Sequence, residues 1–217
     1  MATPKRQQRT LSIDRIVATS IELADRHGLD ALSMRGLAGR LDVTAMSLYN
    51  HVANKDALID LMLEVVVVEI VAPDIDKPWR DMMRRRAISM RKVLLSHPWA
   101  ARILVSRISL GDAAVRDIDV TTGCLVTNGF TYAQADWARN AINNHVYGFI
   151  LQELNFPVEP NDYRAAAAQY LPAIDQHKFP FMYAGALEII EGTYDGILNF
   201  EFGLDLILEG LERWIGT

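Results

Sequence analysis

The sequence predicts an all-α protein, and three observations carry this prediction. Apolar residues recur at spacings of three to four through most of the 217-residue chain, which is the period of an amphipathic helix. Glycine, proline and asparagine separate these periodic segments. No two segments alternate polar and apolar residues in the manner of paired strands. Because half of the residues are hydrophobic, the chain can bury a substantial core.

The first 55 residues are expected to form three short helices. Ser12 stands before an amphipathic run that ends at Gly28, a common C-terminal helix stop. Ser33 then begins a second helix, and a tight connection over 42–44 leads to a third. We therefore expect helices over about 12–27, directly after Ser33, and over about 45–51.

A longer fourth helix is expected to connect these three to the rest of the chain. Leu58, Leu61 and Met62 mark its apolar face, whereas its tail, VVVVEIV, is β-branched and would also suit a strand. Pro73 and Pro78 then interrupt the chain and indicate a boundary. The predicted organisation is a three-helix domain over 1–55, a connecting helix over about 55–72 and a larger helical domain over 73–217.

The second domain is expected to contain seven helices, because apolar periodicity returns at Trp79 and persists to the end of the chain. The separators contain proline or glycine, as in His97-Pro98, Asn128-Gly129 and Phe179-Pro180. The predicted ranges are 79–96, 98–107, 112–128, 132–155, 162–173, 180–194 and 199–215.

Charge is distributed unevenly between the two domains. The net charge of -5 argues by itself against DNA binding, because duplex affinity depends largely on Lys and Arg neutralising phosphates. The first 55 residues, however, hold eight basic and five acidic side chains, a balance of +3, which leaves 14 basic and 22 acidic ones, a balance of -8, for the remainder. A basic end on an acidic body suits a protein that presents one end to phosphate.

Several function classes find no support in the sequence. The N-terminus lacks the apolar segment of a signal peptide, Cys124 is the single cysteine, and the longest apolar run is far shorter than the ~20 residues that span a bilayer. We therefore expect a cytoplasmic protein without membrane contact. The patterns of zinc, calcium, phosphate-loop, dinucleotide and serine-hydrolase sites are missing, so we expect no metal, no cofactor and no enzyme activity.

The third short helix has an unusual exposed face. Leu48 is expected to point inward, which leaves a face without Glu or Lys. Ser, Tyr and His can donate to phosphate, Asn can pair with an adenine edge, and Ala and Met can contact thymine methyl groups. Two helices joined by a tight turn, with such a face on the second, are typical of a DNA-binding helix-turn-helix. The outward residues are Ala45, Met46, Ser47, Tyr49, Asn50 and His51, with Ser33 and Lys55 at neighbouring helix N-termini.

This segment resembles the DNA-binding domain of the tetracycline repressor (TetR) family. The resemblance implies that Arg35, Ala45, Met46 and Ser47 contact bases or phosphate and that Tyr49, Asn50, His51 and Lys55 face the DNA backbone. Ala45 and Met46 depart from the residues of the tetracycline repressor itself, so the resemblance does not extend to the operator sequence. It rests on Leu37-Ala38, Leu41, Val43, Leu48-Tyr49, His51-Val52, Asn54-Lys55 and Ala57-Leu58.

Two parts of the second domain resemble the C-terminal domain of the tetracycline-repressor branch, namely His97-Pro98-Trp99 and the segment FEFGLDLILEGLE near the end. This resemblance implies a homodimer in which helices near 132–155 and 199–215 form a four-helix interface. Gly203 and Gly210 favour close packing independently, because a glycine within a helix otherwise costs about 1 kcal/mol. Two symmetric helix-turn-helix units imply a near-palindromic operator on double-stranded DNA.

The family also implies a ligand-responsive repressor that a small-molecule inducer releases from DNA, through a coupling of about 1 to 3 kcal/mol. An apolar, aromatic pocket would suit an uncharged or weakly polar effector. The candidate pocket residues are Trp99, Asn144, Tyr147 and Tyr183, and core or interface packing is the alternative for each.

Other interpretations stay open at this point. A helical enzyme or small-ligand carrier could use the N-terminal helices only as structure, and an activator of the same family has no distinguishing feature. Lys5, Arg6 and Arg9 could enter a minor groove or form a solvated tail. The run Arg84-Arg85-Arg86 could form a second basic patch, but charge runs on helices are usually solvated, and we expect the same here.

Overall fold

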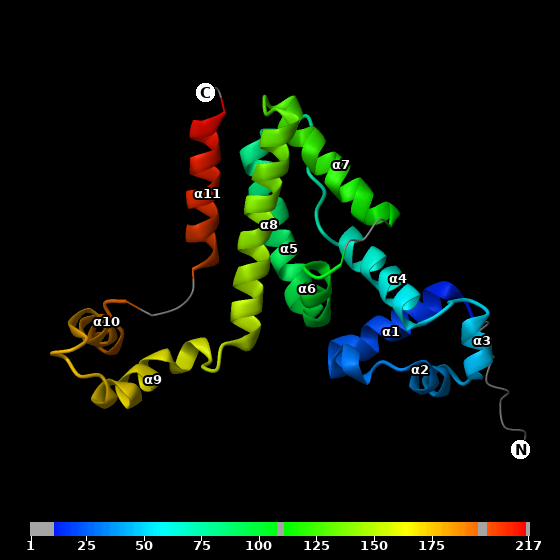
Figure 1. Ribbon diagram of the computed structural model, residues 1–217, viewed down its shortest axis with the longest axis horizontal. Helices are drawn as coiled ribbons and strands as arrows, with labels where there is room; N and C mark the ends of the chain where they lie inside the picture. Colours follow the sequence, from blue (N-terminus) through cyan, green and yellow to red (C-terminus); the bar gives the residue numbers. More distant parts are fainter. Residues whose placement is uncertain (1–10, 108–110, 195–198, 216–217) are drawn as a thin grey trace, which may run out of the picture.

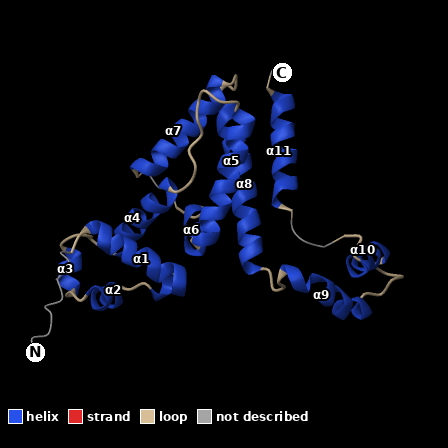
Figure 2. Cartoon of the chain, turned by 180° about the vertical axis from the view of Figure 1, so that it is seen from behind, coloured by secondary structure: helices blue, strands red, loops and turns tan. Residues whose placement is uncertain are grey.

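The computed structural model describes residues 11–107, 111–194 and 199–215. Within these residues it contains eleven α-helices, short 3-10 turns and no strand, which confirms the predicted all-α class (Figure 2). No helix in these ranges has both the length and the apolar character needed to cross a membrane. Figure 1 shows three regions, which we call the head (α1 to α4), the body (α5 to α8 and α11) and the arm (α9 and α10).

Each helix of the head is capped at its N-terminus by a side chain. Ser12, Ser33, Thr44 and Asn54 each accept a hydrogen bond from a backbone N–H in the first turn that follows, at 2.8 to 3.3 Å. Such a cap satisfies a donor that has no partner inside the helix, and it therefore fixes where the helix begins. The four helices are α1 Ile13–His27, α2 Met34–Leu41, α3 Ala45–Tyr49 and α4 Lys55–Val68.

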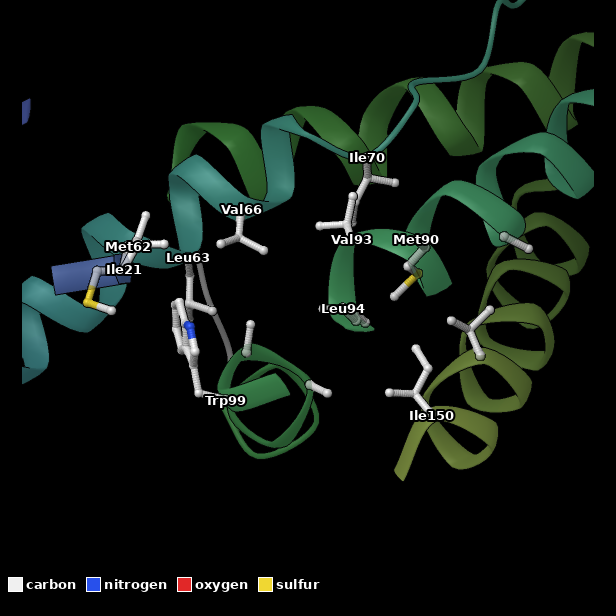
Figure 3. Close-up of a cluster of buried hydrophobic side chains, with 14 of the residues drawn as sticks. Ile21, Met62, Leu63, Val66, Ile70, Met90, Val93, Leu94, Trp99 and Ile150 are labelled. Carbon is white, nitrogen blue, oxygen red and sulfur yellow. The ribbon is translucent and has the colours of Figure 1, made fainter. Parts of the chain in front are cut away.

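The fourth helix stays helical through its run of valines. Helix α4 ends at Val68, before the predicted end near 72, and the last three residues of VVVVEIV form a turn and a loop. The strand alternative is therefore wrong, because tertiary packing outweighs the β-preference of branched side chains. Val66 is fully buried, and α4 packs against α1 as well as α7. Figure 3 shows Leu63 and Val66 in one cluster with Leu94 and Trp99 of the body. The connecting helix thus belongs to the cores of both regions.

The long helix α8 is the centre of the body. Helices α5, α6, α7 and α11 all pack against it, and its buried face carries Ile142, Val146 and Ile150. Buried side chains of head and body form one continuous cluster, so Pro73 and Pro78 interrupt the helices but not the core. The body helices are α5 Trp79–Ser96, α6 Pro98–Leu104, α7 Asp112–Thr127, α8 Tyr132–Asn155 and α11 Phe200–Trp214.

The arm projects away from the body (Figure 1). Helices α9 Tyr163–Tyr170 and α10 Pro180–Glu191 pack against each other, and neither contains a buried residue. The helix predicted over 162–173 is shorter, because 3-10 turns stand on both sides of α9. Helix α10 stops before its predicted end at 194, because Gly192 adopts a left-handed conformation at φ 81°.

Candidate nucleic-acid interface

A tight turn joins α2 to α3. Asp42 ends α2 in the left-handed backbone conformation at φ 59°, and the Val43 N–H then donates to the Ala38 carbonyl at 3.0 Å. Thr44 caps α3, and Leu48 of α3 is fully buried in the head core, as expected. The sequence therefore folds into the predicted helix-turn-helix, with one short face of α3 inside and the rest outside.

The predicted contact residues lie on the surface of this unit. Met46 is 70 % exposed and Tyr49 is 47 % exposed, whereas Leu48 between them is buried. Exposure of large apolar side chains to water costs free energy, and this cost is removed when another molecule covers them. Of the other predicted residues, Ser33, Arg35, Asn50 and His51 are exposed, and Ala45, Ser47 and Lys55 are half-buried.

Thr44 and Ser47 form a hydroxyl pair at the start of α3. The Ser47 N–H donates to Thr44 Oγ1 at 3.2 Å, and the two hydroxyl oxygens lie 2.9 Å apart. This pairing restricts the rotation of the Ser47 side chain at the exposed edge of the helix. Thr44 was missing from the residues predicted from the sequence, although a threonine directly before a helix is a recognisable capping signal.

Several cations of the head are already engaged within the protein. Arg26 and Arg40 share the Glu22 carboxylate at 3.0 and 3.2 Å. Arg35 is exposed on α2, and it forms no ion pair with any described residue. Arg35 is therefore a guanidinium of the head that has no carboxylate partner among the described residues and can meet DNA. Lys5, Arg6 and Arg9 lie outside the described residues.

Lys55 has a structural contact in addition to its predicted role. Its Nζ donates to the Leu29 carbonyl at 3.2 Å, which ties the start of α4 to the segment after α1. An ammonium group has three N–H donors, so two remain for a phosphate. The body holds the same turn of α4 from the other side, because Arg107 pairs with Asp56 and with Asp60.

Comparison with known proteins decides the family. Residues 16–62 match the model of bacterial regulatory proteins of the tetR family, and residues 72–215 match the model of the tetracyclin repressor-like C-terminal domain. The chain belongs to the TetR family. It is a DNA-binding transcriptional regulator, and its helix-turn-helix lies within the N-terminal match.

Relatives of this TetR-family chain match over nearly its whole length. An HTH-type transcriptional regulator of Saccharopolyspora erythraea is 40 % identical over 98 % of this chain and 91 % of its own. The HTH-type transcriptional repressor DrrR1 of Streptomyces coeruleorubidus is 29 % identical over 94 % of this chain and 78 % of its own. ActR from Streptomyces coelicolor, solved in complex with actinorhodin, is 30 % identical with a TM-score of 0.80, over 96 % of this chain and all of ActR.

The four residues predicted for the effector pocket lie in different surroundings. Trp99 is buried in the core, and its indole Nε1–H donates to Asp25 of α1 at 2.7 Å. Tyr147 of α8 is half-buried, and this burial raises the pKa of its phenol. Asn144 is exposed on α8, and Tyr183 lies on α10 in the arm. The structure thus brings Trp99 and Tyr147 into the common core and leaves the other two outside it.

The three arginines of the run on α5 lie in different surroundings, and Arg85 is exposed. Arg86 is 2 % exposed, its Nε and Nη2 contact both carboxylate oxygens of Asp117 at 3.1 and 2.6 Å, and its Nη1 donates to Asn143 at 3.0 Å. Arg84 pairs with Glu201 of α11 at 2.5 Å. The expectation of a solvated run is therefore wrong for Arg86, which is buried against a carboxylate of α7, whereas Arg84 keeps part of its side chain at the surface. Spacing alone did not reveal which arginine of the run points inward.

A groove of about 610 Å³ separates α4 from α7. Its walls are mainly valine and alanine, and Glu64 of α4, which lines it, accepts a hydrogen bond from the Ala113 N–H at 2.7 Å. Helix α7 has no side-chain cap of its own, because Gly111 precedes it. A Cβ atom at Gly111 would collide with Glu64 Oε1. Glu64 therefore caps α7 from a different helix, and the missing side chain at 111 makes room for it.

Helices α8 and α11 pack together and still expose large apolar side chains. Trp137 of α8 stacks on Trp214 of α11 with ring centroids 5.7 Å apart, yet Trp137 is 60 % exposed. Phe202 and Leu206 of α11 are 63 % and 56 % exposed. These side chains make the outer side of the α8–α11 pair apolar.

The two glycines of α11 have different surroundings. A Cβ atom at Gly203 would collide with the imidazole of His145, so this glycine allows α11 to approach α8 closely within the chain. His145 Nε2 also lies 2.9 Å from the Phe200 carbonyl oxygen. A Cβ atom at Gly210 would meet no described atom within 4 Å, so packing within the chain does not require that glycine.

Proposed function

We propose that two copies of this chain bind a near-palindromic operator on double-stranded DNA, repress transcription there, and leave when a small molecule binds the body. The observation that carries the proposal is the outer face of α3, where Met46, Tyr49, Asn50 and His51 are exposed without a carboxylate among them. Such a face meets phosphates without charge repulsion. Related proteins named as repressors, and ActR solved with actinorhodin, support the repressor and effector parts.

Each residue of the interface has a proposed role. The start of α3 reads base edges, since its small and apolar side chains can enter a major groove. Residues at its end and at the N-termini of α2 and α4 hold the phosphates and so set the orientation of the helix. Arg35 could contact either a base or a phosphate. The proposed base-reading residues are Ala45, Met46 and Ser47, and the proposed phosphate-binding residues are Ser33, Tyr49, Asn50, His51 and Lys55.

The homodimer is proposed to form through α8 and α11. The exposed Trp137, Phe202 and Leu206 provide an apolar surface on these two helices, and burial of such area supplies most of the free energy of protein association. Gly210 offers a flat approach for a partner helix, because no atom of the described residues would lie within 4 Å of a Cβ atom there. The dimer would hold two helix-turn-helix units on successive half-sites.

The effector is proposed to bind in the groove between α4 and α7. A volume near 610 Å³ falls within the range of ligand pockets, about 300 to 1,000 Å³. Val65 and Val68 are partly exposed to the solvent there, and an apolar ligand would cover them. Because α4 also belongs to the head, a ligand that separates α4 from α7 would break the Glu64 cap and displace the helix-turn-helix.

Substitutions that fill the groove test this location. Val68→Trp is expected to lower the binding of the apolar dye anilinonaphthalene sulfonate, measured by fluorescence on the folded protein. Ile118→Trp, on α7 and outside the groove lining, serves as the matched control. Equal dye binding by the two variants would exclude the groove as the apolar site.

The organisation follows from these roles. We place DNA binding within residues 1–55, the connection over about 55–72 and dimerisation within 73–217, and the effector lies between the connection and α7 of the second domain. The protein is proposed to act in the cytoplasm, where it meets DNA, and to act by binding and not by catalysis.

The deciding experiment is a mobility-shift titration with DNA that flanks the protein's own coding region. Sequence-dependent binding is expected, and Ser47→Ala should change the preferred sequence, whereas Tyr49→Ala should weaken binding to most sequences alike. A shuffled fragment of equal length is the control for nonspecific binding. A folded dimer that binds both fragments equally would refute the proposal.

A further inference from the structure

A buried histidine lies where the head meets the body. The ring of His97, between α5 and α6, is 11 % exposed, and both of its nitrogen atoms face carboxylates. Nδ1 lies 2.8 Å from Oδ1 of Asp25 in α1, and Nε2 lies 3.3 Å from Oε2 of Glu69, directly after α4. Trp99 donates from Nε1 to the same Asp25 oxygen at 2.7 Å. We call Asp25, Glu69, His97 and Trp99 the junction cluster.

The hydrogen bonds of the junction cluster require a particular protonation state. An ionised carboxylate only accepts hydrogen bonds, so each ring nitrogen must carry a proton to bond its partner. A neutral imidazole has one N–H and one lone pair, and only the imidazolium has two N–H groups. Both contacts of His97 therefore exist together only when the ring is charged.

Loss of the ring proton affects the two contacts unequally. Asp25 accepts from both His97 and Trp99 and lies at the shorter distance, so the neutral ring keeps its proton on Nδ1. The lone pair of Nε2 then faces the Glu69 carboxylate, and the contact becomes repulsive. Glu69 is 47 % exposed at its side chain and can turn away, whereas Asp25 stays in place.

A second set of cations is available to Glu69. Arg85 and Lys92 of α5 line the same surface groove as Glu69, and they offer it a partner that keeps its charge at neutral pH. On the α1 side of Asp25, Arg26 pairs with Glu22. A Glu69 released from His97 can therefore turn toward α5, which would change how the end of α4 is held against the body.

We propose that His97 is a positioning residue for DNA binding, which holds the head against the body through Asp25 and Glu69 when it is protonated and through Asp25 alone when it is neutral. This goes beyond effector control, because it makes the position of the head depend on pH without any ligand. A head that is held by both contacts has less freedom to lose on binding, so DNA binds more tightly at the lower pH.

The variant that tests the proposal is Glu69→Gln, which lies at a partly exposed site and is not expected to unfold the protein. A glutamine amide can accept from Nε2–H or donate to its lone pair, so the contact no longer depends on the ring proton. Glu191→Gln removes the same charge from the end of α10 and serves as the matched control.

The first measurement is the distance between spin labels on the full chain, one at Asp30→Cys in the head and one at Asp119→Cys on α7, with Cys124→Ser. Between pH values of about 5.5 and 8, the label distance in the otherwise unchanged protein and in Glu191→Gln is expected to shift or broaden. The Glu69→Gln distance is expected to stay constant. A distance that does not change with pH in the parent protein, or that changes equally in Glu69→Gln, would overturn the proposal.

The second measurement is affinity for DNA that flanks the coding region, at constant salt and at pH values of about 5.5 and 8. We expect the parent protein to lose about two- to fivefold more affinity than Glu69→Gln over this interval. Titration of His51 or of other groups at the interface affects both proteins and cancels in the ratio. Equal losses would exclude a role of the junction cluster in DNA binding. Failure to bind any DNA specifically would instead refute the proposed operator, and the spin-label distances would then test the junction cluster alone.

Discussion

The head and the arm are both pairs or groups of short helices, yet they are stabilised in different ways. All four head helices begin at a side-chain cap, and each buries at least one residue. The two arm helices have no side-chain cap at their N-termini and bury nothing. Phe181 of α10 is 91 % exposed, whereas Leu48 of α3 is fully buried.

The sequence information that specifies each region is therefore distributed differently. The head is specified within its own sequence, because caps set the helix ends and a local core sets their packing. The arm lacks both, so its apolar side chains gain little from the rest of this chain. Three pairs of substitutions, each with one member in the head and one in the arm, are expected to separate the two regions.

The largest difference is expected for loss of an apolar side chain. Leu48→Ala should lower the free energy of unfolding by about 2 to 5 kcal/mol, because it leaves a cavity in the head core. Phe181→Ala removes a larger side chain from the arm, and it should change the free energy of unfolding by less than about 0.5 kcal/mol. Urea unfolding followed by circular dichroism measures both values. Comparable losses would show that the arm has a core of its own or is covered in solution.

A smaller difference is expected for loss of a lysine. Lys55→Ala should weaken binding to most DNA sequences alike and reduce the slope of log affinity against log salt by about 0.9, the value for one phosphate contact. Lys178→Ala in the arm, where Lys178 Nζ lies 3.7 Å from Asp175, should leave the slope unchanged. Anisotropy titrations with labelled DNA at several salt concentrations measure the slopes. A changed base preference with an unchanged slope for Lys55→Ala would contradict its phosphate role.

The smallest difference is expected for loss of a threonine hydroxyl. Thr44→Ala removes the cap of α3 and should cost about 1 kcal/mol of stability. Thr193→Ala removes a hydroxyl that donates to the Glu188 carbonyl in the exposed end of α10, and its cost should stay below about 0.5 kcal/mol. Thermal melts of the two variants under identical conditions compare them. The same decrease in both would indicate that the Thr44 cap does not limit the stability of α3.

Much of the fold could be predicted from local patterns. Ser12, Gly28 and Ser33 mark helix ends that side-chain or backbone hydrogen bonds confirm. The tail of α4 was ambiguous, because its valines favour strands locally and only contacts with α1 and α7 make them helical. The predicted C-terminal ends of α9 and α10 lie beyond the observed ones. For α9 the reason is that the 3-10 turn at Leu171–Ala173 continues the helical period.

The candidate sites could be predicted only in part. The surface of α3 followed from one buried position, Leu48, which orients the remaining residues of a short helix. The body was less accessible, because periodicity does not say which of three successive arginines faces Asp117 or whether Asn143 or Asn144 points inward. The Glu64 cap of α7 depends on two helices that are far apart in sequence, so no local pattern predicts it.

The unbroken core between head and body also has a thermodynamic consequence. Because Leu63 and Val66 of α4 share a cluster with Leu94 and Trp99, the two regions are expected to melt in one cooperative transition. A molecule that binds either region only in the folded state then raises the same melting temperature. Effectors of this regulator can therefore be found by thermal shift, before a single base of its operator is known.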